Sequence, residues 1–226
     1  MLLDGDSQRD IAKQLGVTQP AISCQVARER TDGARPSDLV TAGRAVLRQV
    51  AKRRGFTKLA DLAQEMGIAS ASIYACFGSK EDLFRQVMAL YTATAGAPPR
   101  QALTDTPTTR MAIERMLSAT VDQITSADSP HYCMLVLAAP TGAIENDAVL
   151  EFLAEGRRGQ RAAIRARLER GVAEGDLAAS ADCDALARYY ATVVQGLSIQ
   201  ARDGATRSEL DDVVACAIAA WDALAR

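Results

Sequence analysis

The sequence of 226 residues predicts an all-helical fold, on three observations. Apolar residues recur at helical spacing over residues 39–54 and over most of residues 108–226. Two short segments, residues 7–26 and 57–77, share one pattern of a helix, a glycine and a second short helix. Ser79 and the aspartate three residues after it form the sequence of a capping box, which is typical of a helix start.

The first helix pair is expected at residues 7–26. The apolar residues of SQRDIAKQL share one helical face, Gly16 ends that helix, and Thr18 is suited to cap the next one. Residues 31–37, TDGARPS, have the composition of a linker. Two short helices bury too little apolar area to be stable alone, so this pair needs support from the rest of the chain, from a partner subunit or from residues further upstream.

The second helix pair has its support within the chain. A helix over residues 39–54 ends at Gly55, and TKLADLAQEM begins at Thr57 and ends at Gly67. The short segment ASASIYAC follows, and then a longer helix over residues 80–95. The two pairs align at a constant offset of 51 residues, which matches Asp10 with Asp61. The offset also matches positions where a helix-turn-helix needs a small, a turn-forming or an apolar residue: Ala12 with Ala63, Gly16 with Gly67, Val17 with Ile68, and Ile22 with Ile73.

Charge is divided unevenly along the chain. Residues 1–90 hold 13 Lys and Arg against 10 Asp and Glu, and residues 91–226 hold 13 against 18. Residues 43–58 carry six basic side chains and no acidic one, and Arg44 and Arg48 are among them. Such a segment beside a helix-turn-helix suits contacts with DNA phosphates, although taken alone it is more often a solvated helix face.

The composition argues against several classes of protein. There is no apolar run of ~18 residues and no secretory signal, which predicts a cytoplasmic protein without a membrane span. The five cysteines are scattered and none forms a C-x-x-C pair, so reduced and mostly buried thiols are expected. His131 is the single histidine, and there is no nucleophile elbow or phosphate loop, so we expect neither an enzyme nor a cofactor. His131 and Cys133 are too few ligands for a zinc site.

Residues 56–91 carry a family pattern. Their sequence, FTKLADLAQEMGIASASIYACFGSKEDLFRQVMALY, resembles the DNA-binding domain of the TetR family of bacterial transcriptional regulators. Two positions depart from that family, since Cys76 stands where it often has His and Ser70 where it often has a basic residue. These changes bear on operator sequence and affinity more than on DNA binding itself. The residues that carry the resemblance are Thr57, Leu62, Ala63, Gly67, Tyr74, Phe77, Lys80 and Leu83.

The resemblance implies a TetR-like three-helix DNA-binding head at residues 37–84 and a helical ligand-binding and dimerisation domain at residues 85–226. Residues 1–36 would be an additional N-terminal helix-turn-helix with its linker. The implied function is that of a sequence-specific transcriptional regulator, a homodimeric repressor that a small-molecule ligand releases from its DNA operator. The alternative is an architectural DNA-binding protein that does not respond to an effector.

Candidate DNA contacts lie in both helix-turn-helix units. In the second unit, short hydroxyls and a methyl group suit base edges, while Thr57, the Tyr74 hydroxyl and Lys80 suit phosphates. In the first unit, exposed glutamines suit adenine. Alternatively Tyr74 is a packed aromatic residue, and the first unit only supports the head. The complete set is Thr57, Ser70, Ala71, Ser72, Tyr74, Lys80, Gln19, Ser23, Gln25, Arg44 and Arg48.

Five further helices are expected, over residues 107–125, 131–139, 146–175, 181–202 and 206–225. The last of these helices begins with a second capping box, which Thr206 and Glu209 form. An apolar stripe in this helix by itself favours the chain's own core. The resemblance, with the small residues Ala191 and Gly196 of the preceding helix, favours a dimer interface formed by the last two helices. The stripe is Leu210, Val213, Val214, Ala217, Ile218 and Trp221.

A ligand pocket is expected among these C-terminal helices, because cavities between the helices of a bundle are common binding sites. The candidates are methionine, aromatic and histidine side chains, although residues of these types at helical spacing are most often core. They are Met116, His131, Tyr132, Met134, Phe152, Tyr189 and Tyr190.

Overall fold

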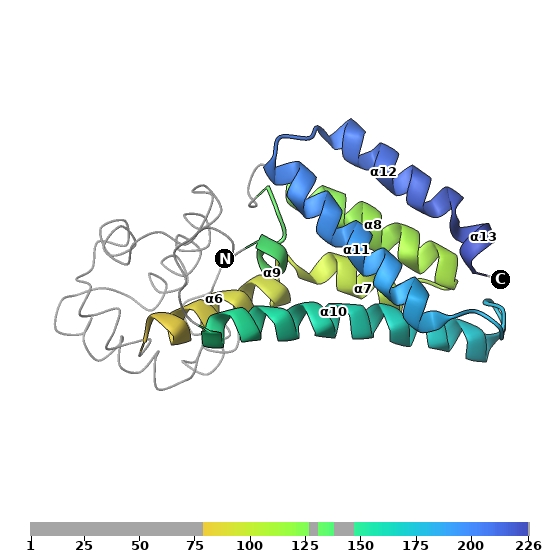
Figure 1. Ribbon diagram of the computed structural model, residues 1–226, viewed down its shortest axis with the longest axis horizontal. Helices are drawn as coiled ribbons and strands as arrows, with labels where there is room; N and C mark the ends of the chain where they lie inside the picture. The colour runs from red at the N-terminus through yellow and green to blue at the C-terminus, as the bar shows by residue number, and fades with distance from the viewer. Residues whose placement is uncertain (1–78, 127–130, 138–146, 226) are drawn as a thin grey trace, which may run out of the picture. The chain divides into compact units, whose positions relative to one another are not determined.

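The computed structural model describes residues 79–126, 131–137 and 147–225 (Figure 1). The DNA-contact candidates from Gln19 to Tyr74 lie outside the described residues, as do both predicted helix-turn-helix units. Every described element is an α-helix, which confirms the predicted class within these ranges. None of the described helices is both long and apolar enough to cross a membrane.

The chain divides into two compact units, Met1–Thr94 and Ala95–Arg226. In the first unit the structure describes a single element, α6 (Lys80–Ala93). The boundary expected after residue 84 falls inside this helix, which continues for nine residues beyond it. The remaining described helices, α7 to α13, belong to the second unit.

The start of α6 forms the capping box that the sequence predicts. The Asp82 backbone N–H donates to the Ser79 hydroxyl at 3.0 Å, and the Ser79 backbone N–H donates to the Asp82 carboxylate at 3.2 Å. These bonds satisfy two donors that a helix N-terminus otherwise leaves free. Further along, α6 has one buried apolar face, made by Phe84, Val87, Met88 and Tyr91.

The second unit begins with two helices joined at a corner. The sequence patterns do not predict α7 (Ala97–Asp105). Pro98 and Pro99 in its first turn are the signal that could have located it, because proline is favoured at that place in a helix. α8 (Thr109–Thr125) follows after three residues and packs against α7.

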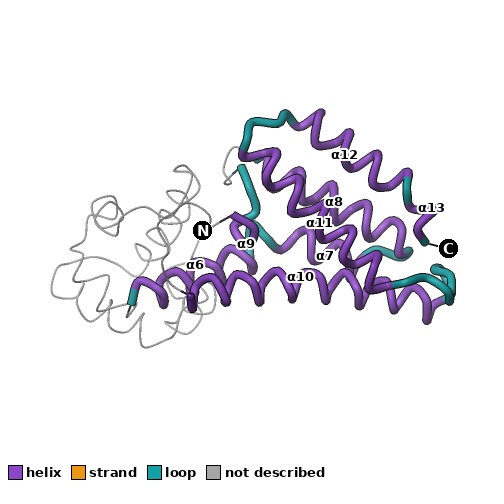
Figure 2. The backbone as a smooth tube through the Cα atoms, viewed as in Figure 1, coloured by secondary structure: helices purple, strands orange, loops and turns teal. Residues whose placement is uncertain are grey.

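The other helices complete a bundle. The short α9 (Met134–Leu137) precedes α10 (Asp147–Glu174), which is the longest described helix. α11 (Cys183–Arg202) packs against α8 and α10, and α12 (Arg207–Ala219) packs against α8 and α11 (Figure 1). The last turn is α13 (Trp221–Leu224). Figure 2 shows the short loops that join α10 to α11 and α11 to α12.

The core of the second unit lies among α7, α8, α10, α11 and α12. Most of the apolar stripe of the last helix belongs to it, since Leu210, Val214, Ala217 and Ile218 are at most 8% exposed and Trp221 is 6% exposed. The stripe is therefore core of its own chain, and its assignment to a dimer interface is wrong for these residues. Because the stripe faces inward, a dimer formed through α11 and α12 has to use their opposite faces.

Candidate functional site

Lys80 is the DNA-contact candidate that falls within the described residues. It is the first residue of α6 and directly follows the Ser79 cap. The hydrogen bonds from Ser79 hold the pKa of the Asp82 carboxyl below its ordinary value, so this carboxylate stays ionised at the helix N-terminus. The capping box fixes where α6 begins, and it therefore fixes the backbone position from which Lys80 extends.

The seven candidate ligand contacts do not form one cluster. Tyr132, Met134, Met116 and Tyr190 are at most 4% exposed. Phe152 on α10 is partly exposed. The remaining two, His131 and Tyr189, are exposed on the surface of the described part, and Tyr189 is 38% exposed.

Two of the buried candidates belong to the main core. Met116 and Tyr190 are members of the large apolar cluster, and the Tyr190 hydroxyl donates to the Ala217 carbonyl of α12 at 3.3 Å. The Tyr190 ring also lies 6.0 Å from the ring of Trp221, measured between centroids. Burial raises the pKa of Tyr190 to about 12, with a further contribution from neighbouring Tyr189, so the phenol stays neutral. These contacts indicate a packing role for Tyr190 between α11 and α12.

The other two buried candidates, Tyr132 and Met134, belong to α9 and the residues just before it. α9 is held on both sides by hydrogen bonds to its backbone. Arg157 of α10 donates from Nη1 to the Leu135 carbonyl at 2.9 Å, and the Cys133 N–H donates to the hydroxyl of Ser198 in α11 at 3.3 Å. The segment from Tyr132 to Leu135 is thus bonded to the two long helices that follow it, α10 and α11.

The side chain of Leu135 in α9 packs closely on the backbone of α10 at Gly156. A Cβ atom added to Gly156 would lie 2.6 Å from a methyl carbon of Leu135. Burial raises the pKa of the Tyr132 hydroxyl, and the positive charge of Arg202 on α11 opposes this shift. The region around α9 is therefore largely apolar, with the positive charges of Arg157 and Arg202 beside it.

Sequence reasoning missed the polar residues that face inward from α10. Arg167 is 3% exposed and donates to the Thr109 hydroxyl at 2.7 Å. Gln160 has a buried amide oxygen for which the structure has no hydrogen-bond partner. The signal in the sequence was their spacing, since both share a helical face with Leu153 and Ile164.

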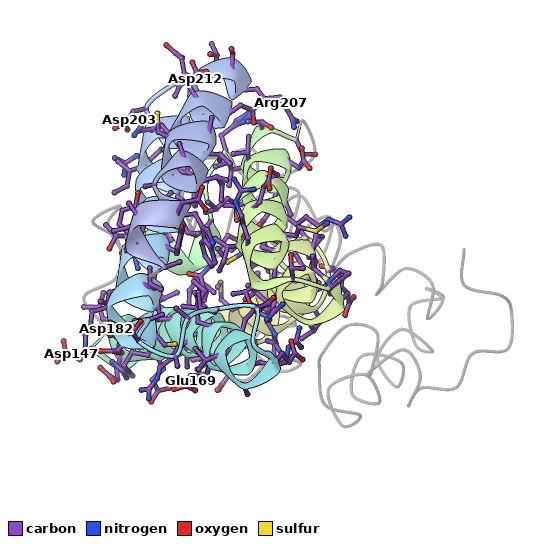
Figure 3. The ribbon with its side chains drawn as sticks, turned by 90° about the vertical axis from the view of Figure 1, so that its right-hand side faces the viewer. Asp147, Glu169, Asp182, Asp203, Arg207 and Asp212 are labelled. Carbon is purple, nitrogen blue, oxygen red and sulfur yellow. The ribbon has the colours of Figure 1, made fainter. Side chains whose placement is uncertain are left out.

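The outward faces of α11, α12 and α13 carry apolar and small side chains. Tyr189, Ile199 and Leu224 are three of the five large apolar residues that are exposed among those described. Small exposed residues accompany them on α12, where they allow close approach of another helix: Ala215, Cys216 and Ala219. The charged side chains Asp203, Arg207 and Asp212 lie at the edge of the part of the bundle that α11 and α12 form (Figure 3).

Metal binding has no support among the described residues, since no group of three or more His, Cys, Asp and Glu side chains there could hold an ion. The described cysteines, Cys133, Cys183 and Cys216, are free thiols. Burial is the largest cause that raises the pKa of the Cys183 thiol, which favours its protonated, unreactive form.

Comparison with known proteins gives the family. The family model for bacterial regulatory proteins of the tetR family matches residues 45–87. A solved structure of a cysteine mutant of the TetR family transcriptional regulator CifR, complexed with 26-bp double-strand operator DNA, is 41% identical to this chain. The match covers 80% of this chain and 95% of that one, with a TM-score of 0.75. This chain belongs to the TetR family.

Two further relatives agree with this assignment. A TetR transcriptional regulator from Rhodococcus sp. RHA1 is 33% identical over 84% of this chain and 98% of its own, with a TM-score of 0.52. The HTH-type transcriptional repressor ComR of Escherichia coli strain K12 is 26% identical over 171 residues, which are 75% of this chain and 81% of ComR. The recognition of the family from residues 56–91 is confirmed, and so is the prediction of a DNA-binding transcriptional regulator.

Proposed function

We propose that this TetR family member is a homodimeric repressor that binds a near-palindromic operator and leaves it when a small molecule binds among its C-terminal helices. The observation that carries the proposal is the 41% identity to CifR, over 95% of the length of a chain that was solved on operator DNA. ComR is a transcriptional repressor. Two subunits related by a two-fold axis present two heads, which need two half-sites of matching symmetry.

The DNA contacts are proposed as the sequence predicts them. Ser70, Ala71 and Ser72 face the major groove, and the Tyr74 hydroxyl and Thr57 bond to phosphates. Lys80 binds a phosphate from the first turn of α6, where the helix N-terminus adds a favourable partial charge. Arg44 and Arg48 contribute further phosphate contacts from the basic segment.

The experiment that tests this function measures operator affinity by fluorescence anisotropy over a range of salt concentrations. The operator is first selected from genomic DNA with the purified protein. Tyr74→Ala is expected to weaken binding, and Lys80→Ala is expected to weaken it with a smaller dependence on salt, because one phosphate contact is lost. Unchanged affinity in both variants would contradict the proposal.

The N-terminal helix-turn-helix is proposed as a second DNA-reading element. Its support is the 51-residue offset at which it matches the second helix-turn-helix, together with the basic residues Arg28, Arg30 and Arg35 in and near the linker. Gln19, Ser23 and Gln25 would contact bases from it. It would extend the operator beyond the half-site that the TetR head reads.

The dimer is proposed to form through the outward faces of α11 and α12, and these faces support it in two ways. Exposed Tyr189 and Ile199 supply apolar area, and small residues such as Ala215 and Ala219 let helices of two subunits approach closely. With α11 and α12 of the second subunit, these helices would form a four-helix interface.

Effector release separates the proposed repressor from an architectural DNA-binding protein. An architectural protein keeps its affinity for DNA in the presence of any small molecule, whereas a repressor of this kind loses affinity with one class of compound. The largely apolar surroundings of α9 support release of a repressor by an effector, because small-molecule sites are mostly apolar with few polar groups. We propose a cytoplasmic location and no catalytic role.

A further inference from the structure

The middle of α10 carries an inward-facing polar residue that the core does not explain. Gln160 follows Leu153 by seven residues and precedes Ile164 by four, so the three share one face of the helix. Leu153 and Ile164 are both 0% exposed. Gln160 lies between them and is partly exposed. This face of α10 is therefore less completely covered at Gln160 than at Leu153 and Ile164.

Packing alone does not explain the surroundings of the Gln160 amide group. Its oxygen is buried and has no hydrogen-bond partner in the structure. A buried acceptor without a partner destabilises the fold, and such groups in native proteins call for an explanation. A ligand that donates a hydrogen bond would supply the missing partner.

The position of Gln160 is fixed by the way α9 is attached. Arg157, one turn earlier on α10, donates to the Leu135 carbonyl, and Gly156 lets Leu135 approach the α10 backbone. On its other side α9 is bonded to Ser198 of α11. Gln160 thus lies one helical turn beyond the point at which α9 meets α10.

We infer that Gln160 binds the hydroxyl group of a neutral, largely apolar effector that lies beside α9, between α10 and α11. This inference rests on the proposed function, because it names the chemistry of the effector. A hydroxyl both donates and accepts, so it can satisfy either end of the amide. Leu153 and Ile164 on the same face of α10, and the buried Met134 of α9, offer apolar surface for the rest of the molecule.

We infer a neutral rather than an anionic ligand because the cations that face inward from α10 already donate hydrogen bonds. Arg157 donates to the Leu135 carbonyl. Arg167 donates from its terminal nitrogens to the Thr109 hydroxyl and the Pro107 carbonyl and lies 3.7 Å from the Asp176 carboxylate, while its Nε has no hydrogen-bond partner among the described residues. A carboxylate entering this region would lose its hydration and would have to compete with these partners for the arginine donors.

The first test is the melting temperature of the full-length Gln160→Met variant without any ligand. Methionine has a similar length and no hydrogen-bonding amide. If the amide oxygen is unpartnered, its removal raises the melting temperature, by about 2 °C or more for a chain of this size. An unchanged or lower melting temperature shows that the amide already has its partners, and it overturns the inference.

The second test compares three probes of similar shape at pH 7: 2-phenylethanol, ethylbenzene and phenylacetate. Binding is measured from the rise in melting temperature with probe concentration. We expect 2-phenylethanol to bind about fivefold more tightly than ethylbenzene to the unmodified chain, and equally tightly to Gln160→Met, since one hydrogen bond is lost. Tighter binding of phenylacetate, no binding of 2-phenylethanol, or the same preference for the alcohol in both proteins overturns the inference.

The control variant is Gln101→Met, at an exposed position on α7, away from the proposed dimer interface. It is expected to retain both the melting temperature and the preference for the alcohol. Operator affinity is measured on the same samples without a probe, which separates the two hypotheses. Failure of the unmodified chain to bind any operator defeats the proposed function, whereas the melting temperatures decide the role of Gln160 independently.

Discussion

Asp176, in the turn after α10, caps the first turn of α8 through Thr109. The Thr109 backbone N–H donates to one carboxylate oxygen at 2.6 Å, and the Thr109 hydroxyl donates to the other at 2.5 Å. Gly175, with φ of +80°, allows the chain to turn so that Asp176 reaches α8. This contact spans 67 residues of sequence and ties the end of α10 to the start of α8.

The Asp176 contact makes stability depend on pH. Burial acts to raise the pKa of this carboxyl, but the hydrogen bonds from Thr109 and the charge of Arg167 outweigh it, so the pKa is lowered. A lowered folded-state pKa gives stability that is fully present above the ordinary aspartate pKa of about 3.9 and is lost as pH falls through the lower folded value.

We therefore predict that Asp176→Asn lowers stability by about 1–2 kcal/mol at pH 7, as the loss of a helix cap does. Thermal unfolding between pH 2 and pH 7 should show this difference shrinking as pH falls below about 4. Asp211→Asn is the matched control, because the exposed pair of Asp211 with Arg207 contributes little. A difference that stays constant down to pH 2 would contradict the electrostatic explanation.

Two glycines of α10 should respond oppositely to alanine. A Cβ atom on Gly171 would lie 2.0 Å from the Thr109 hydroxyl oxygen and 2.5 Å from an Asp176 carboxylate oxygen, whereas nothing lies within 4 Å of one on Gly159. Gly171→Ala is expected to cost about 1–3 kcal/mol through overpacking. Gly159→Ala is expected to stabilise the helix by about 0.5–1 kcal/mol. Urea unfolding of both variants checks the prediction, and equal effects would refute it.

Dimerisation should fail when a long cation is placed on the proposed interface. Ala219→Arg puts it on the exposed face of α12, and Ala162→Arg puts the same change on the exposed face of α10 as a control. We expect the first variant to sediment as a monomer in analytical ultracentrifugation and to lose operator affinity at least tenfold, because two heads no longer bind together. If both variants remain dimers, the interface lies elsewhere.

DNA footprinting tests whether the N-terminal helix-turn-helix reads DNA. The full chain is compared with a chain that begins at Pro36, on the same operator. A second reading element predicts a protected site that is longer by about a half-turn or more on each side, given a helical repeat of ~34 Å, and Gln19→Ala should reproduce part of that loss. If the shorter chain folds, dimerises and protects the same base pairs with equal affinity, residues 1–36 do not read DNA.

The sequence could predict the features of this protein that depend on neighbouring residues. Ser79 and Asp82 are three residues apart, as are Thr206 and Glu209, and both capping boxes form as expected. The C-terminal helices follow their apolar periodicity because each helix shields one continuous face from water. The TetR family could also be recognised, because its pattern lies within residues 56–91.

The sequence could not decide whether an apolar helix face packs against the chain's own helices or against a partner subunit. The periodicity of the stripe that includes Leu210 and Val214 favours a core but also permits a dimer interface, which the family resemblance suggested. The contacts of α12 with α8 and α11 place the stripe in the core. Tyr189 and Tyr190 are adjacent aromatic residues, yet Tyr190 is 0% exposed and Tyr189 is 38% exposed. Residue type alone does not distinguish them, because neighbouring positions on a helix point in different directions.

The local chemistry of the chain thus determined its helices, their caps and its family. The tertiary structure decided which polar residues matter inside the bundle, as it did for Asp176 at the start of α8 and for Gln160 beside α9. The physical reason is the separation in sequence over which each interaction acts. Caps and periodicity act over three to seven residues, whereas a buried hydrogen bond or an unpaired acceptor is defined by groups that only the packing of distant helices brings together.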